Sequence, residues 1–288
     1  MIVSTFIDGL SLGAIYALIA LGYTMVYGIA KMLNFAHGDI IMVGAYTIFS
    51  VLSMQLGTFG IVLGVLLPII LCMLLGILVE RFAYKPLRGA SPLAVLITAI
   101  GVSYLLQGTS QLIFGVTPEP VDFKIPGHIG SLNVYTLVTL IVAAIIMISL
   151  TLFVKYTKTG RAMVAVSEDK AAASLMGINV NKIIAITFAI GSSLAACASI
   201  FYLMQIPQVS PTFGSMPGIK AFTAAVIGGI GSIPGAMLGG VRLGLVEKIC
   251  LSIPAIASYT TAIEFSLLII ILLVKPSGLL GKKRREKV

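Results

Sequence analysis

The chain is poor in charged residues. Only 10% of its 288 residues are Asp, Glu, Lys or Arg, whereas 58% are hydrophobic. A soluble domain of this size needs many more polar side chains to cover its surface, so this composition excludes a soluble globular protein. The hydrocarbon core of a bilayer requires no such cover. The chain is therefore expected to be an integral membrane protein with lipid as its main partner.

Cysteine and histidine are also scarce. The three cysteines, Cys72, Cys197 and Cys250, lie in apolar stretches without paired or metal-ligand spacing, so they are interpreted as packing groups and no metal site is predicted. Neither His37 nor His128 has a nucleophile at catalytic spacing, so we expect no catalytic residues and no enzyme activity. The first residues lack the positive region of a secretory signal, and the first apolar stretch is expected to be retained.

Long apolar runs make up most of the chain. Seven of them approach or exceed the roughly 20 residues that a membrane-spanning helix needs. They cover residues 7–29, 37–56, 59–79, 93–114, 134–154, 183–206 and 257–275. Residues 137–152 are apolar at almost every position, which is typical of a buried helix and differs from the alternating strands of a membrane barrel. The predicted fold is an all-α, polytopic membrane protein with one domain over residues 1–288.

Most of the 19 basic residues flank these runs, and they also account for the net charge of +9. They gather at Lys31, at 81–88, in the loop 155–182 and in the tail 275–288. The positive-inside rule places these segments in the cytoplasm, and the N-terminus and the loop 115–133 outside. Because the charges do not form one basic face, no nucleic-acid partner is expected.

An eighth apolar stretch, residues 219–251, is broken near Gly231, Pro234 and Gly235. With an external N-terminus and a cytoplasmic tail, this stretch must re-enter on one side or cross twice, which gives about eight membrane-embedded elements. Irregular backbone at membrane depth survives only beside protein or water, as in the broken helices of transporters. Glycines spaced four residues apart also allow simple close helix packing, and both interpretations remain open.

The loop 155–182 contains a short predicted helix. Ser167 is the expected N-cap, and an Ala-rich run follows it as far as Gly177, where the helix is expected to end. From composition alone this helix is either an idle connector or a docking element. The chain has no Gly-Lys-Ser/Thr phosphate loop, so no nucleotide site is predicted on it.

Several segments together resemble the permeases of branched-chain amino acid ABC importers, and the match covers nearly the whole chain. The coupling loop of that family is similar to Gly160-Arg161-Ala162 and to residues 173–180. The other similar segments are 16–22, 33–39, 44–46, 210–214, the glycine-rich region through Glu247, and 275–281. Arg242 departs from the family pattern, in which an aliphatic residue is expected. This departure leaves open whether that helix face meets lipid or the transport pathway.

The resemblance implies a subunit of the bacterial inner membrane that forms half of a pathway for leucine, isoleucine and valine. Its partners would be a second, related permease, two cytoplasmic ATPases that bind ATP and Mg, and an external solute-binding protein. The chain itself would hold no cofactor. Urea, short amides and other small organic solutes remain alternative cargoes within the same class. A secondary transporter is the alternative from another class, but the two halves show no visible repeat.

The resemblance also implies two groups of functional residues. The residues expected to couple the chain to the ATPases are Gly160, Arg161, Glu168, Asp169, Ala173 and Gly177. The candidates for the pathway are Asn34, His37, Asp39, Gly228, Gly229, Gly231, Gly235 and Glu247.

The polar pathway candidates can also be explained by structural roles, such as helix capping or charge neutralisation. Asn34, His37 and Asp39 are expected near the cytoplasmic boundary, where Asp39 either lines the pathway or caps a helix start. His37 and Asp39 are two residues apart and should point to different helix faces, which argues against a proton relay. Glu247 is followed by Lys248 and could simply be neutralised by it. Glu264 is the other acid in apolar surroundings.

Overall fold

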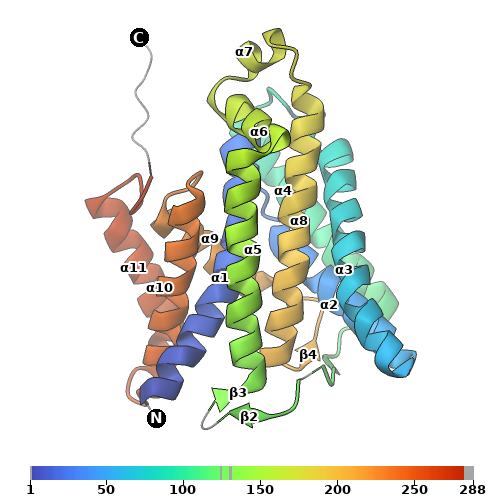
Figure 1. Ribbon diagram of the computed structural model, residues 1–288, viewed down its shortest axis with the longest axis vertical. Helices are drawn as coiled ribbons and strands as arrows, with labels where there is room; N and C mark the ends of the chain where they lie inside the picture. The colour runs from blue at the N-terminus through green and yellow to red at the C-terminus, as the bar shows by residue number, and fades with distance from the viewer. Residues whose placement is uncertain (1, 124, 130–131, 282–288) are drawn as a thin grey trace.

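A computed structural model describes residues 2–123, 125–129 and 132–281, and parts of the predicted loop 115–133 and tail 275–288 fall outside these ranges. Helices occupy most of the described chain (Figure 1). They are α1 Ile2–Ala30, α2 His37–Ser53, α3 Gly57–Val79, α4 Pro92–Phe114, α5 Val134–Tyr156, α6 Lys158–Glu168, α7 Lys170–Leu175, α8 Val180–Gln205, α9 Ser215–Gly228, α10 Ile233–Ser252 and α11 Thr260–Val274. The predicted all-α polytopic fold is confirmed.

Two very short antiparallel strand pairs complete the described structure. β1 (Glu119–Pro120) pairs with β4 (Gln208–Val209), and β2 (His128–Ile129) pairs with β3 (Leu132–Asn133). One π-helical turn, Glu80–Tyr84, extends α3, and one 3-10 turn, Ala257–Tyr259, precedes α11. In the described residues, six helical segments are long and apolar enough to cross a membrane, and α2 is a shorter apolar helix of 17 residues.

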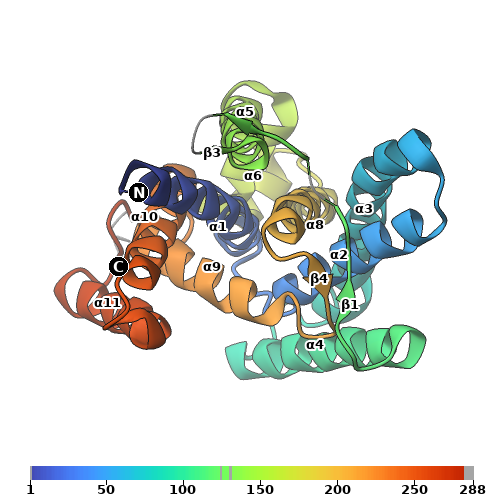
Figure 2. The same ribbon diagram turned by 90° about the horizontal axis from the view of Figure 1, so that it is seen from below.

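The core lies around α1 and α8, which are buried along most of their length. Seen along the bundle, α10 and α11 lie on one side of this pair and α3 on the other, while α4 runs along the edge near α2 (Figure 2). α3, α4, α5 and α11 expose many large apolar side chains. Such a surface would aggregate in water but is suited to contact with lipid or with other membrane chains.

Glycines let α10 lie directly against α1. A Cβ atom placed on Gly13 would lie 2.7 Å from the Cα of Val241, and one on Gly240 would overlap the backbone of Ala17. Contacts at this spacing require small residues on both helices. Because later positions on α10 meet earlier positions on α1, the two helices are antiparallel.

The broken apolar stretch forms two antiparallel helices, α9 and α10. Gly228 packs against Gly235, and the intervening turn contains Gly229 and Gly231 at φ values of 108° and 91°. Gly231 approaches Gly28 near the end of α1. The break predicted near Gly231 is therefore present, and both arms beside it are helical.

The described parts of the basic segments lie together at one end of the bundle. Lys170 Nζ donates a hydrogen bond of 2.8 Å to the carbonyl of Ala30, the last residue of α1. Arg88 donates to Asn181 beside the start of α8, and the backbone of 279–280 pairs with that of 227–228. Helices α6 and α7 project at this end, and the N-terminus and short strands lie at the opposite end (Figure 1). This arrangement agrees with the predicted separation of the basic and non-basic connections.

The glycine contacts generate a stability prediction. Gly240→Ala adds a methyl group against the backbone of Ala17, and we expect it to reduce the free energy of unfolding by about 1–3 kcal/mol. Gly101→Ala on α4 is the matched control, because no atom lies within 4 Å of the added methyl group. Unfolding titrations in mixed micelles measure both. Equal effects of the two substitutions would contradict the close approach of α1 and α10.

Candidate functional site

Three charged side chains meet inside the bundle. Lys220 Nζ on α9 lies 2.7 Å from Glu247 Oε1 on α10 and 3.2 Å from Glu264 Oε2 on α11. Tyr16 on α1 donates a 2.7 Å hydrogen bond from its hydroxyl to Glu247 Oε2. We call these four residues the Lys220 cluster. The cluster links the first helix of the chain, α1, with the three consecutive helices α9, α10 and α11.

The Lys220 cluster is almost completely removed from solvent. Lys220 is 8% exposed, Tyr16 is 2% exposed and Glu264 is fully buried. Removing charges from water costs several kcal/mol per ion, so each charge depends on its partners. One ammonium faces two carboxylates, and Glu264 Oε1 has no hydrogen-bond partner in the part of the chain that the structure describes. Charged groups in this position are functional candidates by default.

The expectation that Lys248 neutralises Glu247 is wrong. Adjacent helix positions point about 100° apart, so the partner of Glu247 comes from another helix, and it is Lys220. The sequence analysis did not single out Lys220 or Tyr16. Lys220 could have been noticed as the one charged residue at the start of a long apolar run.

His37 lies deeper in the bundle than expected, and Asn34 and Asp39 lie close to it in the chain. Residues 31–36 fold back into the bundle, so α2 begins beside the middle of the protein: a Cβ atom on Gly22 of α1 would collide with the His37 ring. All three side chains are buried. The prediction of a position near the cytoplasmic boundary is therefore wrong for His37.

Each of these polar residues contacts a different element. Asp39 Oδ1 accepts a 2.8 Å hydrogen bond from Gln107 Nε2 of α4. Asp39 lies in the first turn of α2, as its expected place at a helix start requires, and Ala36 occupies the N-cap position itself. The His37 ring lies 4.7 Å from that of Tyr23. His37 and Asp39 thus face different helices, as their spacing predicts.

The N-termini of α2 and α9 meet within the bundle. Gly38 touches Gly214 at the start of α9, and a Cβ atom on Gly218 would lie 2.9 Å from the Cα of Gly38. Helices that begin inside a bundle and converge there are a feature of transporter pathways. Gly228 and Gly235 contact each other closely, whereas the turn residue Gly231 lies near Gly28.

The predicted coupling helix, expected from Ser167 to Gly177, is interrupted at Asp169, between α6 and α7. Asp169 accepts hydrogen bonds from the backbone N–H groups of Ala171 and Ala172 at 2.8 and 3.0 Å, so it caps α7. The prediction that Ser167 caps this helix is wrong, since the Ser167 hydroxyl donates to the carbonyl of Val164 in α6. The extended backbone of Asp169 separates the two helices.

The tip of α7 is apolar and exposed. Leu175 and Met176 are 90% and 82% exposed, and Gly177 follows them at a φ of 80°, which ends the helix as expected. Ala173 is buried behind this tip. Burial and the nearby Arg88 lower the pKa of Lys170 below its ordinary value. The tip therefore presents two large apolar side chains from a firmly attached base.

The other coupling candidates lie on α6 and at its junction with α7. Gly160 packs against the backbone of Phe153 and Val154, and no larger residue fits in this turn after α5. Arg161 and Glu168 are exposed. The six predicted coupling residues thus lie along one continuous projection, which we call the α6–α7 projection.

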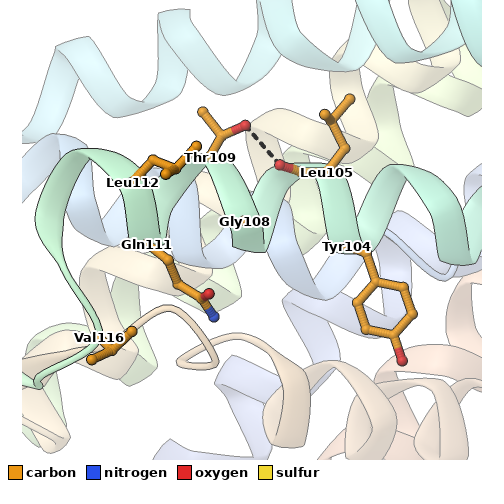
Figure 3. Close-up of a pocket in the computed structure, with 7 residues that line it drawn as sticks. All are labelled: Tyr104, Leu105, Gly108, Thr109, Gln111, Leu112 and Val116. Carbon is orange, nitrogen blue, oxygen red and sulfur yellow. Dashed lines mark hydrogen bonds between the residues drawn. The ribbon is translucent and has the colours of Figure 1, made fainter.

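Helix α4 carries a shallow groove on its exposed side (Figure 3). The groove is lined by Tyr104, Leu105, Gly108, Thr109, Gln111, Leu112 and Val116. Thr109 donates a 2.7 Å hydrogen bond to the carbonyl of Leu105, and added Cβ atoms on Gly101 and Gly108 would meet nothing within 4 Å. The exposed amide of Gln111 is costly against lipid tails. This face is better suited to contact with another chain or with water.

The fold and these features define a multi-pass membrane protein with broken internal helices, a buried charge cluster and a projection at one end, as expected for a membrane transport subunit. The comparison with known families matches residues 5–272 to the model described as "Branched-chain amino acid transport system / permease component". The chain belongs to this family.

Curated relatives match over almost their whole length. The chain is 42% identical to the high-affinity branched-chain amino acid transport system permease protein BraD of Pseudomonas aeruginosa and to its LivH counterpart in Escherichia coli K12. Each match covers 98% of this chain and 96% of the relative. The ribose import permease protein RbsC of Haemophilus influenzae is 26% identical, over 94% of this chain and 84% of that protein. The chain is therefore a transport permease and not an enzyme.

The Lys220 cluster generates a second prediction. Lys220→Met leaves two buried carboxylates without their cation, and we expect the free energy of unfolding to fall by about 3–5 kcal/mol. The triple variant Lys220→Met, Glu247→Gln, Glu264→Gln removes all three charges and should recover most of this loss. Denaturant titrations in mixed micelles measure both variants. A Lys220→Met variant as stable as the wild type would show that the cluster does not hold the helices together.

Proposed function

We propose that the chain forms half of the translocation pathway of an ATP-driven importer for branched-chain amino acids. The observation that carries this proposal is the family match over residues 5–272, together with 42% identity to permeases named for that transport. The converging starts of α2 and α9 support a pathway through the bundle. The residues proposed to line or gate it are Asn34, His37, Asp39, Gly228, Gly229, Gly231, Gly235 and Glu247.

Energy and solute capture are assigned to other subunits. Permeases of this kind work with ATPases and with a solute-binding protein, and this chain has no phosphate-binding loop of its own. We assign the α6–α7 projection to an ATPase and the opposite end, with the short strands, to the external binding protein. In this arrangement two ATPases, holding ATP and Mg, serve a pair of related but different permeases in a bacterial inner membrane.

The cargo is tested by reconstitution. Proteoliposomes that contain this chain with its partner permease, ATPases and binding protein should accumulate labelled leucine in an ATP-dependent manner. Urea and ribose are the comparison solutes, because the class also includes importers for other small solutes. ATP-dependent uptake of urea without leucine would replace the proposed cargo, and leucine uptake driven by an ion gradient without ATP would indicate a secondary transporter.

The α6–α7 projection leads to a third prediction. Replacing Leu175 and Met176 together by Ser removes the exposed apolar tip without touching the core, so the protein should insert normally. We expect uptake to fall at least about tenfold while ATPase subunits still hydrolyse ATP, since loss of interface anchors costs on the order of 2 kcal/mol. Phe82→Ser, an exposed apolar position outside the α6–α7 projection, is the control. Wild-type uptake by the double variant would show that the tip of α7 is not part of the coupling surface.

Orientation is the fourth prediction. The basic segments place the α6–α7 projection in the cytoplasm and the loop after α4 outside. In a chain without native cysteines, Thr117→Cys should react with a membrane-impermeant maleimide on intact cells, and Ser174→Cys should react only after lysis. Both positions are exposed, so accessibility within the subunit does not bias the comparison. The reverse pattern would invert the topology.

A further inference from the structure

Arg242 lies level with the middle of α1, a helix long and apolar enough to span a membrane. It is close to the midpoint of the 20-residue helix α10, about 14 Å from either end at 1.5 Å per residue. Its neighbours Gly240 and Gly244 pack against Ala17 and Gly13, close to the midpoint of the long helix α1. The side chain is therefore too far from both helix ends to extend its guanidinium into water as residues near helix ends do.

Arg242 is also on the outer surface of the subunit. The buried side of α10 carries glycines that contact α1 and α9, whereas Arg242 is exposed. Leu238 and Ile249, four positions before it and seven after it, are 45% and 46% exposed and lie on the same side of the helix. We call Leu238, Arg242 and Ile249 the Arg242 face. Helix α10, which carries this face, lies at the side of the bundle next to α1 and α11 (Figure 2).

The described chain offers Arg242 no carboxylate. The ion pairs among the described residues join Arg88 with Glu80, and Lys220 with Glu247 and Glu264. Asp39, the other acid within the bundle, accepts from Gln107. An arginine at mid-membrane depth is unfavourable when no partner relieves its charge. The exposed position of Arg242 is therefore unfavourable in the isolated subunit.

We propose that the Arg242 face packs against a second, non-identical permease subunit, which supplies a carboxylate at mid-membrane depth to pair with the guanidinium. This inference rests on the proposed function, in which two permeases share one pathway. Arginine forms two parallel hydrogen bonds with a carboxylate, and such a pair is strong where water is excluded. The apolar neighbours Leu238 and Ile249 would exclude water around it.

A second copy of this chain does not offer a free carboxylate for Arg242. Within the described bundle, the buried acids Asp39, Glu80 and Glu264 already have partners in their own subunit, and so does the half-buried Glu247. A symmetric pair would also bring a second unpaired Arg242 into the membrane. The geometry therefore favours a heterodimer, in which the acid belongs to a different sequence.

The fifth prediction tests this pairing in the full complex. This chain carries an affinity tag and is expressed with its second permease, ATPases and binding protein, and the amount of second permease that co-purifies is measured. Arg242→Leu should insert as well as the wild type but retain at least about tenfold less second permease, since it leaves the other charge of a buried pair without its partner. Arg242→Lys should retain more than Arg242→Leu. Lys85→Leu, which removes an exposed positive charge at the end of the bundle, is the control and should retain the wild-type amount.

Each result has one interpretation. If the wild type retains no second permease, the proposed function fails before the Arg242 variants are considered. If the wild type and Arg242→Leu retain it equally, the proposed pairing is overturned. In a chain without native cysteines, Leu238→Cys and Ile249→Cys should crosslink to cysteines on the second permease. If Arg242→Cys instead reacts with a charged, water-soluble thiosulfonate and leucine protects it, the face lines an aqueous pathway and the proposal is wrong.

Discussion

The direct contact of helix backbones at glycines is the constraint on which the rest of the structure depends. α10 lies against α1 through Gly13 and Gly240 and against α9 through Gly235, with no side chains between the backbones. Because the helix backbones lie this close, the side chain of Lys220 on α9 can pair with Glu247 on α10 and Glu264 on α11. In a membrane, apolar burial hardly favours one helix contact over another, so packing and polar contacts determine the arrangement. Here the glycines set the distance and the charges set the register.

Much of the fold follows from local signals in the sequence. Apolar length predicts α1, α3, α4, α5, α8 and α11 to within a few residues, because lipid demands about 20 apolar residues wherever a helix crosses. The break near Gly231 and the end of α7 at Gly177 are also local, since glycine is the residue that adopts positive φ without strain. The separation of basic segments follows from charge alone.

The site was less predictable because its contacts are not local. The partner of Glu247 is 27 positions away in sequence and on another helix, so the neighbouring Lys248 was a misleading choice. The depth of His37 depends on residues 31–36 turning back into the bundle, and neither length nor hydropathy encodes that path. At α7, Ser167 and Asp169 are both good caps. The choice between them depends on how far α6 extends, which is set by its packing at Met163 and Val166.

The hydrogen bond from Lys170 to the last carbonyl of α1 connects α7 mechanically to the core of the molecule. A pull on α7 reaches the end of the most buried helix, whose Gly28 touches the turn at Gly231 between α9 and α10. Force therefore travels along the centre of the subunit and bypasses the exposed helix α4, which packs mainly against α2. This outer helix is free to adjust its tilt to bilayers of different thickness without loosening the mechanical link between the two faces of the membrane.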